Sequence, residues 1–491
     1  MDYSQFLGMK QEIGLLVVFL LVFFYDTFMS KKAQNGLATV TCGLFGLFTA
    51  YTLLCPSVMA DATTFGGMYA TSPVIATIKN ILNIGVFIVL VQSVKWANSE
   101  SQTMRRGEFY ELLLVTLFGM YLMISARHFL LFVIGLEAAS LPLAAMVAFD
   151  KNRYESREAA IKYILTAVFS SAVFMMGLSF VYGLSGSLYF NEIASAISVN
   201  GEVNVLLVLA IAFVIAGVGF KLSLVPFHLW TADVYQGAPT NVTSYLSVIS
   251  KGATAFAFLV IMVQVFGAFY SQVWEWMLYA LIILTITVGN LFAIRQRNMK
   301  RFLAFSSVSQ AGYIMLGVIA LNATGMASLM YYVLVYIFSN LAAFGVLGAI
   351  ENNTGKVSMD DYNGLYKTNP RLSVAMMLAM FSLAGIPPFA GFFSKFFIFT
   401  GALEQGSIAI YMLVLIALIN TIISLYYYLL VVKAMFINDN ETPIAAFKSH
   451  WSERLGLWIS VGGIVLLGIV SCAYNYILEL TQSSNMFAGL L

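Results

Sequence analysis

The chain has 491 residues, of which 60% are hydrophobic and only 10% are charged, and its mean hydropathy is +0.87. So little charge cannot cover the surface of a soluble protein of this length, which excludes the soluble classes. A formal net charge of +2 is also too small to favour a nucleic-acid partner. We therefore expect an integral membrane protein surrounded by the lipid bilayer.

The N-terminus begins MDYSQFLGMKQE and has neither a basic start nor a small-residue cleavage site. This favours a first apolar run that is retained as a span over one removed as a signal peptide. Cys42, Cys55 and Cys472 lie in apolar stretches at unrelated spacings. That pattern indicates buried thiols and predicts neither a disulfide framework nor a metal site.

The chain contains fourteen largely apolar runs, each about as long as the 20 residues that a helix needs to cross the hydrocarbon core. They are longer and more continuously apolar than the strands of a membrane barrel, so we predict an all-α polytopic fold. The runs are 11–30, 35–55, 74–95, 108–126, 129–149, 158–183, 203–230, 239–267, 273–294, 301–321, 326–350, 372–401, 407–436 and 454–480.

Lysine and arginine gather in alternate loops, which is the pattern of the positive-inside rule. If the N-terminus is outside, the loops after odd-numbered helices are inside. They hold Lys31, Lys32, Arg105, Arg106, Lys151, Arg153, Arg157, Arg295, Arg297, Lys300, Arg301, Lys356, Lys367, Arg371, Lys448 and Arg454. The other loops hold few positive charges, with Arg127 the main exception. The alternation predicts both termini on the outer side of the membrane.

Ionisable side chains fall inside several of the apolar runs. Glu137, Lys221, Lys251 and Lys395 are near the middle of their helices, where a charge costs at least about 2.5–3.5 kcal/mol. We interpret these four as functional groups. Lys79 and Lys433 are nearer to helix ends, where snorkelling to the interface is expected. Lys162 is one turn past Arg157, and its interpretation stays open between snorkelling and function.

Two helices are predicted to be broken. Pro226 interrupts helix 7 one turn after Lys221, and Gly385, Pro387 and Pro388 interrupt helix 12 before Lys395. The breaks are an odd number of helices apart, which indicates two inverted five-helix repeats, as in transporters with a site at the midplane. The predicted parts are 1–105 (helices 1–3), 106–270 (helices 4–8), 271–440 (helices 9–13) and 441–491 (helix 14).

The chemistry expected of this arrangement is proton transfer. An exposed lysine titrates near ~10.4, too high for fast exchange at neutral pH, and burial lowers that value. Movement of Glu137 relative to Lys221 would then load or empty the lysine. His228 could join such a relay or be structural. The sequence shows no P-loop, dinucleotide motif or cysteine cluster, so we expect no cofactor and no metal in this chain.

Three strings around these residues resemble the antiporter-like subunits of respiratory complex I (NADH:quinone oxidoreductase). They read GFKLSLVPFHLWTADVYQGAPTNVTSYLSVISKGATAF, NLFAIRQRNMKRFLAFSSVSQAGYIMLGV and FSLAGIPPFAGFFSKFFIF, and the resemblance spans about residues 105–440. The junction DVYQGAPT, Lys395 where subunit M usually has glutamate, and the end soon after helix 14 are typical of the subunit N branch, the counterpart of mitochondrial subunit 2.

The resemblance implies a proton-translocating subunit of a respiratory-chain enzyme. Its neighbours would include the antiporter-like subunit M and the small subunit K. NAD, FMN, iron–sulfur clusters and quinone would be bound by other subunits, which carry the electron transport. Subunits of cation/proton antiporters and of membrane-bound hydrogenases share the fold and remain alternatives, as does a purely structural subunit.

The resemblance also implies residue roles. Glu137 matches the helix 5 glutamate that pairs with the helix 7 lysine, here Lys221. Lys251 matches the central helix 8 lysine, and Lys395 matches the helix 12 residue toward the outer exit. Lys162 matches a helix 6 lysine of the same network.

Overall fold

The computed structural model describes residues 3–29, 36–55, 62–99, 105–200 and 203–484. Lys31 and Lys32, in the predicted loop after the first helix, lie outside these ranges. Within the described residues, 13 helices are long and apolar enough to cross a membrane. Two shorter apolar helices, α16 and α17, make up the run predicted at 372–401. The all-α polytopic class is confirmed.

The first half of the chain forms helices α1 (Lys10–Phe28), α2 (Leu37–Leu54), α3 (Pro73–Ala97), α4 (Arg106–Ser125), α5 (Phe129–Val147), α6 (Tyr154–Ser185), α7 (Phe190–Asn200), α8 (Val205–Leu222), α9 (Leu229–Gly237), α10 (Thr240–Tyr245) and α11 (Lys251–Gln264). The second half forms α12 (Glu275–Arg295), α13 (Met299–Ile319), α14 (Ala323–Thr354), α15 (Leu365–Thr368), α16 (Pro370–Ala384), α17 (Ala390–Leu403), α18 (Ile408–Phe436), α19 (Trp451–Ile469) and α20 (Cys472–Gln482). Shorter elements are the 3₁₀ helices η1 (Tyr3–Met9), η4 (Gly267–Phe269) and η6 (Met359–Tyr362), the π-helical turns η3 (Leu246–Ser250) and η5 (Tyr270–Trp274), and strands β1 (Ala62–Thr64) and β2 (Tyr69–Thr71).

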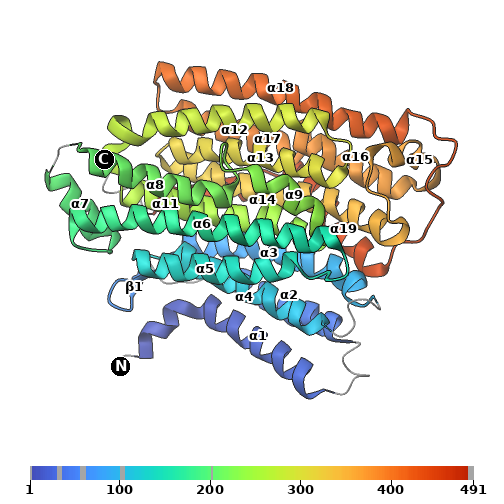
Figure 1. The fold of residues 1–491 in the computed structure, drawn as a ribbon, viewed down its shortest axis with the longest axis horizontal. Coiled ribbons are helices and arrows are strands. Elements are labelled where there is room, and N and C mark those ends of the chain that lie inside the picture. Colours follow the sequence, from blue (N-terminus) through green and yellow to red (C-terminus); the bar gives the residue numbers. More distant parts are fainter. Residues whose placement is uncertain (1–2, 30–35, 56–61, 100–104, 201–202, 485–491) are drawn as a thin grey trace.

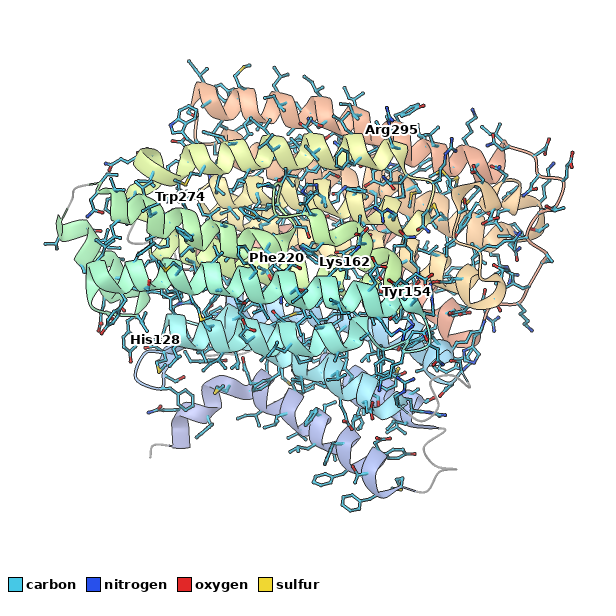
Figure 2. All side chains as sticks on the ribbon, in the orientation of Figure 1. His128, Tyr154, Lys162, Phe220, Trp274 and Arg295 are labelled. Carbon is cyan, nitrogen blue, oxygen red and sulfur yellow. The ribbon has the colours of Figure 1, made fainter. Side chains whose placement is uncertain are left out.

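The long helices lie side by side in one bundle, with α1 along one edge and α18 along the opposite edge (Figure 1). The marks for the two chain ends are at the same side of the bundle (Figure 1). Tyr154 and Arg295 are at the other side, while His128 and Trp274 are at the side of the chain ends (Figure 2). The positively charged loops at Arg153 and Arg297 therefore face away from the chain ends, as the predicted alternation requires.

Burial divides the helices into a central and a peripheral set. Nearly all residues of α13 and of the segment Thr240–Gln264 are enclosed by the rest of the chain, whereas α1, α6 and α18 turn most of their residues outward. The outward side chains include Phe169 on α6 and Ile422 on α18, which are 72% and 69% exposed. Such surfaces are stable against lipid tails, which are as apolar as the side chains themselves. Chemistry sheltered from lipid must therefore be carried by α11, α13 and their neighbours.

Three features differ from the sequence-based expectation. The short helix α7 lies in the predicted loop between helices 6 and 7, and its 11 residues are too few to cross a bilayer. The run predicted at 454–480 is divided into α19 and α20 around Val470 and Ser471. β1 and β2 form an antiparallel hairpin in which Ala62 is opposite Thr71.

Candidate functional site

The predicted break in helix 7 is confirmed. α8 ends at Leu222, Ser223 adopts a left-handed conformation with φ +61°, and α9 begins only at Leu229. A break leaves backbone groups without their helical partners, and these must be satisfied inside the protein. The N–H of Val225 donates to Oγ1 of Thr285 on α12 at 2.9 Å. A neighbouring helix thus stabilises the unwound segment.

The predicted break in helix 12 is confirmed as well. α16 ends at Ala384, Gly385 has φ +87°, and α17 begins at Ala390. The two halves pack closely, because the N–H of Gly391 donates to Oγ of Ser382 at 3.1 Å. A Cβ at Gly391 would lie 1.7 Å from the carbonyl oxygen of Ser382, so only glycine fits at this position.

Lys395 occupies the site that this second break creates. Its side chain is 4% exposed, and Nζ donates to the carbonyl oxygens of Leu383 at 3.0 Å and Ala384 at 3.1 Å. These carbonyls belong to the last turn of α16. The carbonyl groups at a helix C-terminus have no N–H partner within the helix, and this end of the helix carries a partial negative charge. The ring of Tyr313 lies 5.3 Å from Nζ. Lys395 is therefore held by neutral groups.

Lys251 is the first residue of α11 and directly follows the π-helical turn η3. π-helical turns inside helices are frequent at functional sites. Its side chain is 1% exposed, and Nζ donates to Oγ of Ser307 at 2.9 Å and to the Ser307 carbonyl at 3.2 Å. The ring of Tyr235 is 5.8 Å away. This lysine, too, has only neutral partners.

Lys221 lies at the end of α8, 6% exposed, and donates to Oγ of Ser140 on α5. Glu137, one turn before Ser140, accepts a 2.5 Å hydrogen bond from Oγ of Ser171 on α6. Over the described ranges, no ion pair within 4.0 Å joins Glu137 to Lys221. The structure places a serine beside each of these two charges instead of the direct pair that the family resemblance implies.

Lys162 faces outward and is 42% exposed. It pairs with Glu158 at 2.7 Å and with Asp233 of α9 at 2.6 Å. Figure 2 places it inward of Tyr154, the first residue of α6. Asp233 also pairs with Arg301 of α13 at 2.7 Å. Asp233 was not among the predicted site residues, although it follows the predicted run 203–230 by only three positions.

His228 lies in the break of helix 7, next to α9. Its side chain is 7% exposed, and Nδ1 has no hydrogen-bond partner in the protein. The nearest ring is that of Phe292, with centroids 6.3 Å apart. The structure thus brings His228 to the broken segment, and within the described residues no hydrogen bond joins it to Lys221, Lys251 or Lys395.

The expectation that Lys79 snorkels is wrong. Its side chain is 1% exposed, and Nζ lies 2.5 Å from Oε1 of Glu12, which is 2% exposed. Glu12 lies in the first turn of α1, which begins at Lys10, and is buried against Lys79 of α3. Lys433 is exposed near the end of α18, as expected of a snorkelling side chain.

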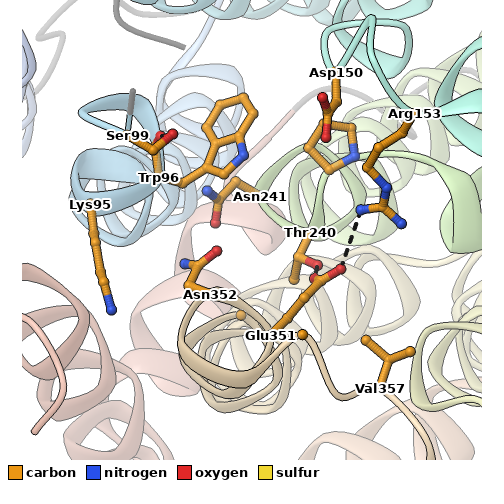
Figure 3. A pocket seen from close by; sticks show the side chains of 13 residues that line it. Lys95, Trp96, Ser99, Asp150, Arg153, Thr240, Asn241, Glu351, Asn352 and Val357 are labelled. Atoms are coloured by element: carbon orange, nitrogen blue, oxygen red, sulfur yellow. Dashed lines mark hydrogen bonds and ion pairs between the residues drawn. The ribbon is translucent and has the colours of Figure 1, made fainter. Parts of the chain in front are cut away.

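Lys300 was expected in a loop, and that expectation is also wrong. It lies in the first turn of α13, 1% exposed, and pairs with Glu351 of α14 at 2.7 Å. Glu351 also accepts from Thr240 and pairs with Arg153 at 3.5 Å (Figure 3). Arg153, Thr240 and Glu351 line a cavity of about 420 Å³ (Figure 3). The pairing needs α13 and α14 to pack together, which composition does not reveal.

The described residues contain no group of three or more His, Cys, Asp or Glu side chains that could hold a metal ion.

Known proteins resemble this chain over nearly its whole length. The family model for the transmembrane part of NADH:quinone oxidoreductase and Mrp antiporters matches residues 126–424. NADH-quinone oxidoreductase subunit N of Phocaeicola vulgatus is 52% identical over 97% of this chain and 98% of that protein. The protein of the same name from Azobacteroides pseudotrichonymphae is 50% identical over 97% and 98%.

Chains of solved structures also resemble this chain over nearly its whole length. A chain of respiratory complex I from Thermus thermophilus matches with a TM-score of 0.78 and 31% identity over 96% of this chain and 98% of that one. A chain of the Mrp complex from Dietzia matches with a TM-score of 0.84 over 99% of this chain and 98% of that one. The two sequences are 20% identical, so this match shows a shared fold alone.

Proposed function

Because the chain belongs to the NADH:quinone oxidoreductase/Mrp antiporter transmembrane family, in its subunit N branch, we propose that Lys221, Lys251 and Lys395 relay protons through it. It is a membrane subunit of a proton-translocating NADH-quinone oxidoreductase of the respiratory chain. The proposal concerns which of its side chains move the proton. Glu137 would act on Lys221 from α5.

One observation carries the proposal. In the described part of the chain, each of the three lysines is enclosed and none has a carboxylate within 4.0 Å. A buried ammonium without a counter-ion is costly, so its neutral form becomes accessible and it can both take up and release a proton. Lys79 and Lys300 are just as buried but have glutamate partners. That contrast separates the proposed carriers from structural ion pairs.

Polar groups continue between Lys251 and Lys395. Ser307, which binds Lys251, lies one turn before Gln310 on α13, and the Gln310 side chain accepts from Tyr332. Gln310 and Lys395 line one small cavity of about 10 Å³, about the room that a single water needs. A proton could thus pass from one lysine to the next through hydroxyls, an amide and water.

Unpartnered polar atoms support a hydrated path. The hydroxyls of Tyr235 and Tyr336 and Nδ1 of His228 are buried and have no protein partner. Buried groups of this kind are usually satisfied by ordered water. Tyr235 lies beside Lys251, and Tyr336 lines the cavity of Lys395. His228 would serve as a side group of the relay, and Lys162 would join it through Asp233.

Two inverted repeats, 106–270 and 271–440, would place the three lysines along one line. The long helices α6 and α14 have 32 residues each, and each ends at a glycine with φ +70°, Gly186 and Gly355. Each is followed by a helix broken near its middle, α8–α9 and α16–α17. Segments 1–105 and 441–491 would flank the repeats.

The assembled complex would supply what this chain lacks. NAD, FMN, iron–sulfur clusters and quinone would be bound by other subunits, with subunits M and K as direct neighbours in the membrane. The positively charged side of the bundle would face the bacterial cytoplasm, and both termini the outer side of the plasma membrane.

The test is the number of protons moved per NADH oxidised by the whole complex in sealed vesicles. Lys395→Ala and Glu137→Ala should each lower this ratio while the complex still assembles. Lys367→Ala is the control, because Lys367 and its partner Asp439 are 72% and 82% exposed. Unchanged ratios in both variants would reject the relay.

A further inference from the structure

Helix α18 lies along one edge of the bundle, and most of its residues face outward (Figure 1). Tyr427 and Tyr428 are exceptions, because both side chains are fully buried. Their rings pack on Phe302 of α13, with centroids 5.5 Å and 6.0 Å from that ring. This peripheral helix thus places two hydroxyl groups among the polar side chains of the core.

The hydroxyl of Tyr428 belongs to a chain of hydrogen bonds between α18 and α14. Nε2 of Gln310 on α13 donates to the Tyr428 hydroxyl at 3.2 Å, and Oε1 of the same amide accepts from the hydroxyl of Tyr332 on α14. The Tyr428 oxygen also lies 2.5 Å from Oγ of Ser306, one turn before Gln310. Both ends of the Gln310 amide are therefore held in one orientation.

This orientation decides where the proton of the Tyr332 hydroxyl points. A hydroxyl group has one O–H donor and two acceptor lone pairs. Tyr332 lines the small cavity that also holds Lys395, and its O–H is directed away from that cavity, to Gln310. Tyr332 therefore offers the cavity only an acceptor.

Two serine hydroxyls of the same cavity are oriented in a similar way. Oγ of Ser394 donates at 3.0 Å to a backbone carbonyl of α17, and Oγ of Ser339 donates at 3.0 Å to one of α14. The hydroxyl of Tyr336, which also lines the cavity, has no protein partner and is free to turn either way. Acceptors favour an ammonium over a neutral amine, so this cavity wall stabilises the charged form of Lys395.

We propose that Tyr428 is a positioning residue for the relay: it holds the Gln310 amide so that Tyr332 presents an acceptor to the cavity of Lys395. The inference rests on the proposed function, because it concerns how Lys395 holds its proton. Without the Tyr428 hydroxyl, Nε2 of Gln310 loses its acceptor, and the amide can turn to donate to Tyr332 instead. Tyr332 then directs its O–H into the cavity, where this dipole opposes the ammonium.

The titratable groups that face Lys395 are tyrosines. The ring of Tyr313 on α13 lies 5.3 Å from Nζ, and Tyr332 and Tyr336 of α14 line the cavity. From α18, Tyr428 lies behind Gln310. The charged residues of α13, α14, α16 and α19 lie in the first or last turn of each helix, at Lys300, Arg301, Glu351, Arg371, Glu453 and Arg454.

The experiment measures the protons moved per NADH oxidised by the whole complex in sealed vesicles, over a range of pH. The ratio should fall at high pH, where Lys395 is no longer protonated. Tyr428→Phe keeps the ring but removes the hydroxyl, so the charged form of Lys395 is less stable. The fall should then occur about one pH unit lower, which corresponds to an about tenfold smaller share of the charged form.

Tyr427→Phe is the matched control. Tyr427 is the adjacent residue and is equally buried, but its hydroxyl donates to Asn290 at 2.9 Å instead of accepting from Gln310. Its pH profile should coincide with that of the wild type. An unshifted profile in Tyr428→Phe, or equal shifts in both variants, would overturn the proposal.

A second variant serves if Tyr428→Phe does not assemble. Gln310→Leu breaks the chain at its next link and should shift the profile in the same direction, so an unshifted profile there would also overturn the proposal. Lys395→Ala separates this proposal from the relay itself. Wild-type pumping in Lys395→Ala rejects the relay, whereas lost pumping in Lys395→Ala with an unshifted profile in Tyr428→Phe rejects only the role of Tyr428.

Discussion

Lys395 reaches back across the break in helix 12, so that its Nζ lies 3.0 Å from the carbonyl oxygen of Leu383. The lysine is on α17 and the carbonyl is in the last turn of α16. The ammonium is thus bound by the helix end that the break exposes. A change in the packing of α16 against α17 should therefore change the stability of the charged form of Lys395.

The contact between the halves depends on Gly391. Gly391→Ala places a methyl group against the Ser382 carbonyl, and we expect a loss of about 1–3 kcal/mol in stability, as for other overpacked cores. A lower melting temperature of the solubilised complex, together with a lower proton-to-NADH ratio, would show it. Gly43→Ala is the control, since open space surrounds Gly43 on α2 and alanine is the better helix former. Equal melting temperatures for the two variants would contradict this prediction.

The hydroxyl of Ser307 is predicted to stabilise the charged form of Lys251. Ser307→Ala removes one of the two acceptors of the ammonium, and a hydrogen bond to a charged group is worth about 1.5–3 kcal/mol. The charged lysine should become about tenfold or more rarer. We expect slower proton translocation in vesicles for Ser307→Ala and none through this chain for Lys251→Met. Wild-type translocation in Lys251→Met would exclude Lys251 as a carrier.

The ion pair of Lys300 and Glu351 is predicted to be structural. Lys300→Met leaves Glu351 buried with one cation fewer, and breaking such pairs costs about 3–5 kcal/mol. Arg297→Ala, two residues before the start of α13, should cost about 0–1 kcal/mol, because Arg297 and its partner Asp360 are 74% and 65% exposed. Thermal melting of the two purified variants measures the difference, and a larger loss for Arg297→Ala would refute the assignment.

His128 should make the stability pH-dependent. Its Nδ1 accepts from the N–H of Leu130 at 3.1 Å and so caps α5, the helix that carries Glu137. Burial lowers the pKa of His128 below its ordinary value, although the Glu192 carboxylate opposes this effect. The unfolded chain then binds more protons than the folded one, so stability falls as the pH drops through the ordinary value of about 6.5.

The matched variant is His128→Asn, because asparagine is a good helix cap that does not titrate in this range. Melting temperatures at several pH values between about 5 and 8 should decline more steeply toward acid for the wild type than for this variant. Parallel curves would mean that protonation of His128 does not affect the cap.

The sequence alone predicted the apolar runs that form the long helices, the two breaks at Pro226 and Pro387, and the enclosure of Lys251 and Lys395. These features follow from local properties, namely the transfer free energy of each apolar run and the missing N–H of proline. Both act within a few residues, so no knowledge of the packing was needed.

Only the tertiary structure decided which side chains meet. Lys79 looked like a snorkelling residue until α1 brought Glu12, 67 positions away, against it. Lys162 turned out to face outward, and Lys221 to contact Ser140 without an ion pair to Glu137. The rotation of each helix about its own axis fixes these partners, and that rotation is set by packing against neighbours that lie far away in the chain.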